Sequence, residues 1–362
     1  MKSNYKKLGD YIRQVDERNT EEFFDESELR GISVTKEFIT SHANLVGVSF
    51  GNYKIVRDGQ FAYIPDTSRR GDRIAIAYND KSTIIVSSIC AVFEVRNVEK
   101  LCPEYLMLWF MRPEFDRYAR FMSNGSAREV FDWDSMCGVE LPIPSIDEQR
   151  RIVHNYKIIT DRIQILRKIN DNLLNTAQTI IKDSIADDCQ DSTVGDIIEL
   201  FDSMRKPMSS LERSGMERIY PYYGAAALMD YVDDYIFEGI FGLLGEDGTV
   251  MDDNGYPIMQ YVWGKFWVNN HAHIFQGKNG YSTEFAYLIL RNTIVRDAVT
   301  GAVQLKINQE NLRKIPIQLP VKDNLQSIES SIQPILQFYR NNCDEILRLN
   351  QMADIILENM SA

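Results

Sequence analysis

The chain has few of the residues that build disulfide frameworks and metal sites. Its 362 residues include only five cysteines (positions 90, 102, 137, 189 and 343), and no two are spaced as C-x-x-C. This odd, scattered set excludes a disulfide scaffold and is typical of reduced thiols in the cytoplasm, where we expect the protein. Four histidines are present. The pair His271 and His273 has no nearby third ligand, so packing and hydrogen bonding are the interpretation and no metal site is predicted.

Long apolar runs are missing as well. No stretch approaches the roughly 20 apolar residues that a membrane helix needs, and residues 1–8 hold no apolar signal-peptide core. A hydrophobic share of 44% with 25% charged residues is ordinary for globular domains. We therefore expect a soluble chain without a membrane partner.

An excess of basic residues is also absent. The formal net charge is −12, and no segment of the chain is basic overall. This excludes binding of nucleic acid through bulk charge alone. DNA binding would need local basic patches or a more basic partner chain.

Motifs for covalent chemistry are not found. The sequence contains no G-x-x-x-x-G-K-[ST] phosphate loop, no G-x-S-x-G elbow and no N-P-P-Y or D-P-P-Y tetrapeptide of an adenine methyltransferase. We therefore predict no catalytic residues and no covalent chemistry by this chain alone.

The chain does contain an internal repeat. When Gly125 is placed on Gly301, the two segments agree in apolar class without a gap over the rest of the chain. Residues 7–12 match residues 193–198 in the same way. The matched apolar pairs are Phe131/Ile307, Met136/Leu312, Val139/Ile315, Leu141/Ile317 and Ile143/Leu319. Each copy is therefore a domain followed by an arm.

Both arms show the spacing of coiled-coil helices. Apolar residues alternate at steps of four and three, which defines a heptad seam. The seam of the first arm is Ile152, Tyr156, Ile159, Ile163, Leu166, Asn170, Leu173, Ala177, Ile180 and Ser184. The seam of the second arm is Ile328, Ile332, Ile335, Tyr339, Asn342, Ile346, Leu349, Ala353, Ile356 and Met360. The alternative is two long amphipathic helices, each packed on its own domain. Pro334 should kink the second helix or mark its start.

Each seam carries one asparagine near its middle. In an antiparallel pair related by a pseudo-twofold axis, Asn170 and Asn342 would face each other and fix the register. The alternative is that both asparagines are exposed to water.

The globular parts have mixed α/β patterns. Residues 53–64 predict strand, Asp-Gly turn and strand, residues 74–78 and 83–95 predict further strands, and residues 104–121 predict a helix. In the second copy we expect strands at 235–241, 261–268 and 273–276 and a helix at 284–291. The expected fold class is α+β: two similar α/β domains (1–145 and 188–320) separated by two long helices (146–187 and 321–362) that form an antiparallel coiled coil.

Basic and aromatic loops are the candidate binding sites. The turn from Ser68 to Arg73 holds three arginines, which could reach phosphates or guanine edges. The candidate DNA contacts are Lys54, Arg69, Arg70, Arg73, Arg205, Lys206, Tyr222, Tyr223, Lys265 and Lys278. For each basic loop, the alternative is an ordinary solvated surface.

Several segments resemble the specificity subunit of Type I restriction–modification systems. Leu141–Ile152 (LPIPSIDEQRRI) is similar to the family's P-x-x-x-E-Q motif at the start of a long helix. Tyr220–Ala225, Tyr231–Tyr235, Gly245–Gly248 and Gly264–His273 are also similar to the family. The second copy differs from this pattern, because Pro320–Gln326 lacks the Glu-Gln pair.

The resemblance implies two target-recognition domains, each reading one block of a gapped double-stranded DNA target, with helices that fix the unread spacer. Two methyltransferase subunits would bind S-adenosylmethionine and methylate a flipped adenine. Two restriction subunits, where present, would use ATP and Mg. This chain would bind no cofactor and would not itself be an enzyme. The competing hypotheses are a two-headed coiled-coil adaptor for protein or glycan ligands and a stand-alone enzyme with an unrecognised site.

Overall fold

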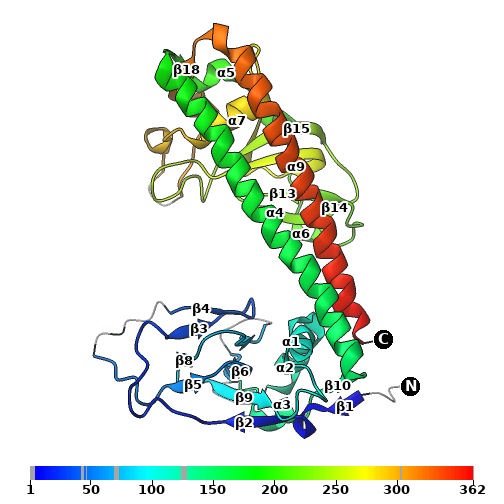
Figure 1. Ribbon diagram of the computed structural model, residues 1–362. Helices are drawn as coiled ribbons and strands as arrows, with labels where there is room; N and C mark the ends of the chain where they lie inside the picture. The colour runs from blue at the N-terminus through cyan, green and yellow to red at the C-terminus, as the bar shows by residue number, and fades with distance from the viewer. Residues whose placement is uncertain are drawn as a thin grey trace. The chain divides into compact units, whose positions relative to one another are not determined.

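The structure, a computed structural model, describes residues 5–41, 45, 47–68, 73–123, 129–301 and 304–361. The chain forms two compact units, Met1–Ile165 with Ile346–Ala362 and Leu166–Glu345. Each unit joins one globular domain to parts of the two long helices α4 (Ile146–Asp187) and α9 (Lys322–Asn359), which are green and red to orange in Figure 1. Among the described residues, no helix is both long enough and apolar enough to span a membrane.

The first unit is built around a four-stranded antiparallel sheet in the order β2-β9-β6-β7. Alternate side chains of its strands face opposite sides. Phe61 and Phe93 pack toward the helices, whereas Ala62 and Val92 pack toward the β5–β8 pair. The strands are β1 (Tyr5–Lys7), β2 (Ile12–Val15), β3 (Arg30–Ile32), β4 (Phe38–Thr40), β5 (Lys54–Val56), β6 (Gln60–Tyr63), β7 (Ile76–Tyr78), β8 (Ile84–Val86), β9 (Ala91–Val95) and β10 (Glu140–Pro142). The helices are η1 (Leu8–Asp10), α1 (Pro103–Met111), α2 (Pro113–Met122) and α3 (Trp133–Cys137).

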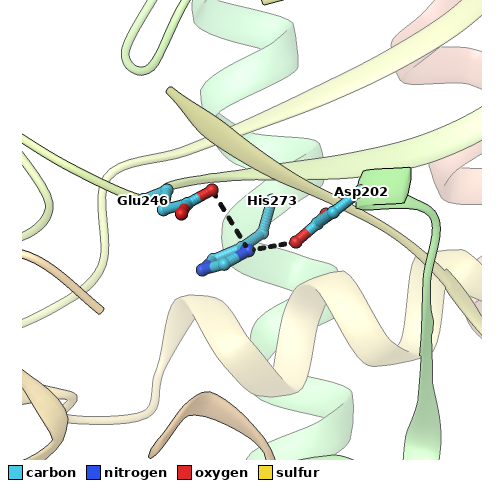
Figure 2. Close-up of side chains that lie close together, drawn as sticks. All are labelled: Asp202, Glu246 and His273. Atoms are coloured by element: carbon cyan, nitrogen blue, oxygen red, sulfur yellow. Dashed lines mark hydrogen bonds and ion pairs between the residues drawn. The ribbon is translucent and has the colours of Figure 1, made fainter. Parts of the chain in front are cut away.

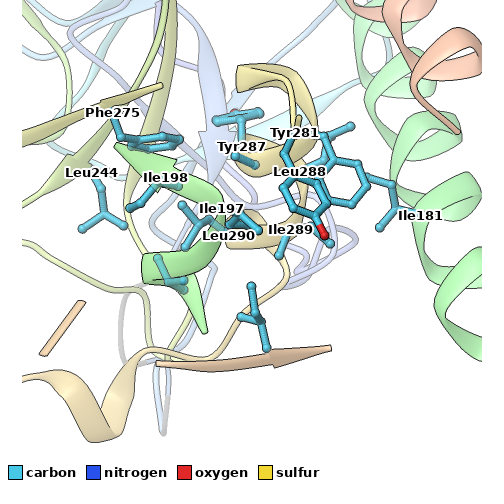
Figure 3. Packing of buried hydrophobic residues seen from close by; sticks show 14 of the residues in the cluster. Ile181, Ile197, Ile198, Leu244, Phe275, Tyr281, Tyr287, Leu288, Ile289 and Leu290 are labelled. Atoms are coloured by element: carbon cyan, nitrogen blue, oxygen red, sulfur yellow. The ribbon is translucent and has the colours of Figure 1, made fainter. Parts of the chain in front are cut away.

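The second unit contains a six-stranded sheet in the order β12-β17-β15-β16-β13-β14. Figure 3 shows one of its apolar clusters, in which Phe275 of the sheet, Leu288 of α7 and Ile181 of α4 take part. The strands are β11 (Cys189–Thr193), β12 (Ile198–Leu200), β13 (Tyr220–Tyr223), β14 (Leu228–Val232), β15 (Phe237–Gly245), β16 (Met259–Val268), β17 (Ala272–Gly277) and β18 (Pro316–Pro320). The helices are α5 (Val194–Ile197), η2 (Asp202–Met204), α6 (Ser210–Arg213), α7 (Thr283–Arg291), η3 (Arg296–Ala298) and α8 (Gln309–Lys314).

The repeat in the sequence is also a repeat in structure. The Leu8 N–H donates to the Val139 carbonyl at 2.8 Å, and the Val194 N–H donates to the Ile315 carbonyl at 3.0 Å. Strand β1 pairs with β10 as β11 pairs with β18. A side chain at Gly9 would lie 2.8 Å from Cβ of Cys137, so the close approach of the backbone explains this glycine.

The two long helices pack together as predicted. Strands β11 and β18 place the end of α4 beside the start of α9. Further along, the Asn342 amide donates to Oδ1 of Asn170 at 2.8 Å, and both side chains are buried. The antiparallel pairing and the Asn170–Asn342 contact are therefore confirmed. In the first unit, Ile159, Ile163 and Ala353 form a separate buried cluster of the helix pair.

The seam differs from the heptad pattern after Asn170. Leu173 and Ile180 are only half-buried and Leu174 and Ile181 are buried in their place, whereas Ala177 is buried as predicted. This extra step of four, a stutter, locally unwinds a coiled coil. The cause is the domain core, which Leu174 and Ile181 join together with Leu336 of α9. In the second unit, the helices therefore pack on their own domain as well as on each other.

Several element boundaries also differ from the sequence prediction. Strands β5 and β6 exist but form no hairpin, because β5 pairs with β8 while β6 pairs with β7 and β9. The helix predicted at 104–121 is split between α1 and α2, because a residue before proline disfavours helical geometry and Arg112 precedes Pro113. Pro334 lies inside α9 and does not mark its start.

The contacts of Gln149 explain the glutamine of the Glu-Gln pair at the start of α4. Its side chain is fully buried, accepts from the Cys102 N–H at 2.8 Å and donates to the carbonyls of Lys100 at 3.0 Å and Pro144 at 2.9 Å. The second copy has leucine at the matching position, and there Glu329 accepts from the N–H of Ser282 at 2.8 Å. Different side chains thus hold the first residues of α1 and α7 in the two copies.

Candidate nucleic-acid interface

A basic groove in the first unit includes Arg73, the last residue of the predicted arginine turn. It measures about 940 Å³ and lies between α2, the β3–β4 turn and the segment before β7. Its lining includes the cations Lys36, Arg73, Arg117 and Arg120, against the single carboxylate of Asp116. Phe121 lines the same groove with 84% of its side chain exposed. Cations beside an exposed aromatic ring suit a nucleic-acid backbone and its bases.

The cations of this groove differ in whether they are already paired with a carboxylate of the same chain. Lys36 Nζ lies 2.5 Å from Asp116 Oδ1, and burial lowers the pKa of Lys36 although Asp116 opposes the shift. Arg117 pairs with Glu114, and Arg120 pairs with Glu129. Arg73 has no ion pair among the described residues and is exposed. Arg69 and Arg70, of the same turn, lie outside the described residues.

The second unit presents rings and cations on the β13–β14 and β15–β16 hairpins. The rings of Tyr220 and Tyr235 lie 5.1 Å apart, and Lys265 Nζ lies 4.4 Å from the Tyr235 ring centre. Arg218 lies 5.5 Å from the ring centre of Tyr231. The hydrogen bond with Tyr235 raises the pKa of the half-buried Lys265, so its ammonium stays charged. This cation–aromatic surface offers phosphate contacts and stacking platforms together.

Three of the predicted DNA contacts lie inside the fold. Lys54 is 8% exposed, with Nζ 3.0 Å from Asp16, and Tyr222 is 1% exposed, with its hydroxyl accepting from the Met208 N–H. Arg205 lies 2.5 Å from Glu246. Because their polar groups are already paired, we assign these side chains to the fold rather than to DNA.

The remaining predicted contacts are at or near the surface. Lys206 is exposed, and its carbonyl accepts from the Trp267 indole at 2.6 Å. Lys278 is half-buried in the turn after β17. Tyr223 is half-buried and lies edge-on to Phe266 at 5.9 Å, and burial raises its pKa to about 12.

Sequence reasoning missed Phe121, Arg218, Tyr231 and Tyr235. The signal for Phe121 is the strong amphipathic pattern of α2, which places an aromatic residue on the polar face. The sequence does not distinguish Tyr220 and Tyr235 from the other tyrosines as a ring pair, because the pairing of the strands decides which rings meet.

A charged cluster in the second unit brings together Asp202, Glu246 and His273 (Figure 2). His273 Nδ1 lies 2.6 Å from Asp202 Oδ2, and Nε2 lies 2.7 Å from the Ile307 carbonyl. Both ring nitrogens of His273 are therefore engaged in hydrogen bonds inside the fold. Burial alone would raise the pKa of Asp202, but His273, the Ile274 N–H and Arg205 hold it below its usual value.

The same cluster is a poor fit for a metal ion. Its three potential ligand atoms lie within 4.8 Å of one another, which is the spacing of a metal site. Arg205 and Lys306 already pair with Glu246, and both His273 nitrogens are engaged in hydrogen bonds. A divalent cation would therefore meet two positive side chains and no free histidine nitrogen. We assign the cluster to the stability of the fold.

Comparison with known proteins places this architecture in a family. The family described as Type I restriction modification DNA specificity domain matches residues 19–175 and again residues 186–349. The two matches cover most of the chain and follow its internal repeat. The chain belongs to this family.

Individual proteins of known sequence or structure are also similar to this chain. A Haemophilus influenzae protein named as a type I restriction enzyme specificity subunit is 39% identical over 126 residues, which cover 34% of this chain and 31% of that protein. The match thus spans about a third of that relative. The crystal structure of a Type I restriction–modification S subunit from M. genitalium has a TM-score of 0.60 at 13% identity, covering 99% of this chain and 96% of that chain, which shows a shared fold. The HsdS subunit from Thermoanaerobacter tengcongensis matches with a TM-score of 0.40 at 14% identity, over 99% of this chain and 96% of that one.

Proposed function

We propose that this chain is the specificity subunit of a Type I restriction–modification complex. It reads a gapped double-stranded DNA target, one block with each unit, and directs adenine methylation and restriction by partner subunits. The observation that carries the proposal is a duplicated domain whose two copies offer different cation-and-aromatic surfaces. Two different readers on one chain suit an asymmetric, two-block target.

Partner chains supply the chemistry in this proposal. Two methyltransferase subunits bind S-adenosylmethionine, and restriction subunits use ATP and Mg. The helix pair offers a docking surface, because Ile158, Ile165, Leu347, Met352 and Ile355 are each about half exposed in the first unit. A bound methyltransferase would also neutralise DNA phosphates. This chain, with a net charge of −12, has no excess of positive charge with which to do so.

Sequencing of methylated adenines tests the proposal directly. Genomic DNA is compared between the source strain, a strain without this gene and the same strain with the gene restored. We expect one gapped, two-block motif to lose its methylation in the deletion strain and to regain it on restoration. Purified methyltransferase subunits that modify the same motif without this chain would contradict the proposal.

Single-residue changes should affect the two blocks separately. With the assembled methyltransferase, Arg73→Ala or Phe121→Ala should weaken recognition of one block by about 1–3 kcal/mol, and Lys265→Ala or Arg218→Ala should weaken the other. Binding to DNA with each block scrambled in turn measures the effect. The control Lys81→Ala removes an exposed charge from outside both surfaces. Equal loss on both blocks would assign these residues to general phosphate contact.

A further inference from the structure

Tyr78 of the first unit and Tyr261 of the second occupy the same place in their sheets. Each tyrosine is reached from one of the matching residues Ile12 and Ile198 by the same steps across the sheet. The path crosses to the paired strand, moves two residues along that strand, and then crosses two further strands through paired residues. The path in the first unit is Ile12, Val95, Phe93, Phe61 and Tyr78, and the path in the second is Ile198, Gly277, Phe275, Gly242 and Tyr261. Helices α1 and α7 also correspond, and Glu104 and Glu284 each stand two residues after the N-cap.

In the second unit, this Tyr–Glu pair holds an arginine of the same chain. The Tyr261 hydroxyl lies 3.1 Å from Glu284 Oε1, and Arg340 Nη1 lies 2.7 Å from the same oxygen and also donates to the hydroxyl. All three side chains are less than 10% exposed. Leu336, one turn before Arg340, is fully buried beside them in the core of the unit.

In the first unit, the same place is an open groove. By the 176-residue offset of the repeat, Thr160 stands where Leu336 stands, and Gln164 stands where Arg340 stands. A groove of about 590 Å³ opens there between α1 and α4, with Tyr78, Glu104 and Thr160 in its lining. The Tyr78 hydroxyl has no hydrogen-bond partner within the described part of the chain.

The inner end of this groove is acidic. Glu104, Asp58 and Asp80 surround Tyr78 and have no ion pair among the described residues. Burial raises the pKa of Tyr78, and these three carboxylates add to the shift. The basic side chains of the groove lie along α4: Arg150 is already paired with Glu99 at 2.9 Å, and His154 and Lys157 follow it. An additional positive charge is therefore favoured at Tyr78 and Glu104.

We infer that the α1–α4 groove of the first unit binds an arginine of a partner protein, in the way that the second unit binds its own Arg340. The occupant is a segment with an apolar side chain one turn before the arginine, as Leu336 stands before Arg340. Its assignment to a methyltransferase subunit rests on the proposed function. Only one of the two copies thus keeps its site open for a second chain.

The test compares binding of the purified methyltransferase subunit to variants of the full chain. Glu104→Gln removes the exposed carboxylate of the groove. Thr160→Leu combined with Gln164→Arg gives the first unit the leucine and arginine that the second unit has at the matching positions. We expect each to weaken one of two methyltransferase binding steps by about tenfold or more in calorimetric titration. Glu217→Gln, the same change at an exposed site in the second unit, should bind as the wild type does. Unchanged thermal unfolding establishes that the variants are folded.

The outcomes separate this inference from the proposed function. Wild-type binding that neither variant weakens would overturn the groove as a docking site and leave the specificity function standing. Weaker methyltransferase binding by Glu104→Gln together with full binding by the Thr160→Leu, Gln164→Arg variant would also overturn it, because an internal arginine must compete with the partner. A wild-type chain that binds no methyltransferase would overturn the proposed function together with this occupant.

Discussion

Replacement of Arg340 by methionine should destabilise the second unit by about 3–5 kcal/mol. The change keeps most of the side-chain volume but removes the guanidinium that pairs with Glu284 and Tyr261. The Glu284 carboxylate, which is 5% exposed, would then be buried without its counter-charge. Urea unfolding followed by hydrogen exchange in β16 and α7 measures the loss in this unit.

A double-mutant cycle separates the ion pair from simple packing. Glu284→Gln combined with Arg340→Met should be less destabilising than the sum of the single changes, because no unpaired charge remains. Arg348→Met, on the exposed face of the same helix, should change stability by less than about 0.5 kcal/mol. Strict additivity of the two changes would show that the charges do not interact.

Acid should unfold the second unit through Asp202 and Glu246. Their neighbours hold both pKa values below the ordinary values of 3.8 and 4.5. The unfolded chain therefore binds more protons in this range than the folded chain, so stability falls as the pH drops below about 4.5. The stabilisation is complete above these ordinary values and is lost as the pH passes through the lowered ones. Thermal unfolding between pH 7 and pH 3 measures the slope.

Asp202→Asn should remove much of this dependence. At pH 7 it should cost about 3 kcal/mol or more, because His273, Arg205 and Gln309 lose the charge that they share. The control Asp134→Asn changes an exposed carboxylate of the first unit. A D202N variant with the acid sensitivity of the wild type would assign the pH dependence to other groups.

The long-range pairing of the helices was predictable because it depends on spacing along one helix. Heptad periodicity and the symmetry of the repeat placed Asn170 opposite Asn342 before any contact was known. The same periodicity misplaced Leu173 and Ile180, since it assumes that a seam faces only another helix. A domain core competes for the same face here, and nothing in the spacing of α4 records the position of that core.

The candidate site was less predictable because it depends on which face of a strand each residue takes. Tyr222 and Lys265 were selected together, yet one fills the interior and the other reaches the surface. In a four-residue strand such as β13, alternation gives too few positions to distinguish the faces. The break before Pro113, by contrast, follows from a rule on the residue before proline, which the prediction of one unbroken helix at 104–121 did not apply.

The pairing of the first and last strands of each domain has a consequence for how such proteins change. Because β1 lies against β10 and β11 lies against β18, the chain enters and leaves each domain through neighbouring strands. Each domain is thus the segment between two paired strands, which hold its first and last residues together. Recombination within the sequences of these paired strands would exchange a whole domain while the ends of α4 and α9 stay in place. Under the proposed function, a single crossover of this kind would replace the DNA block that one domain reads, a change that would otherwise require many substitutions.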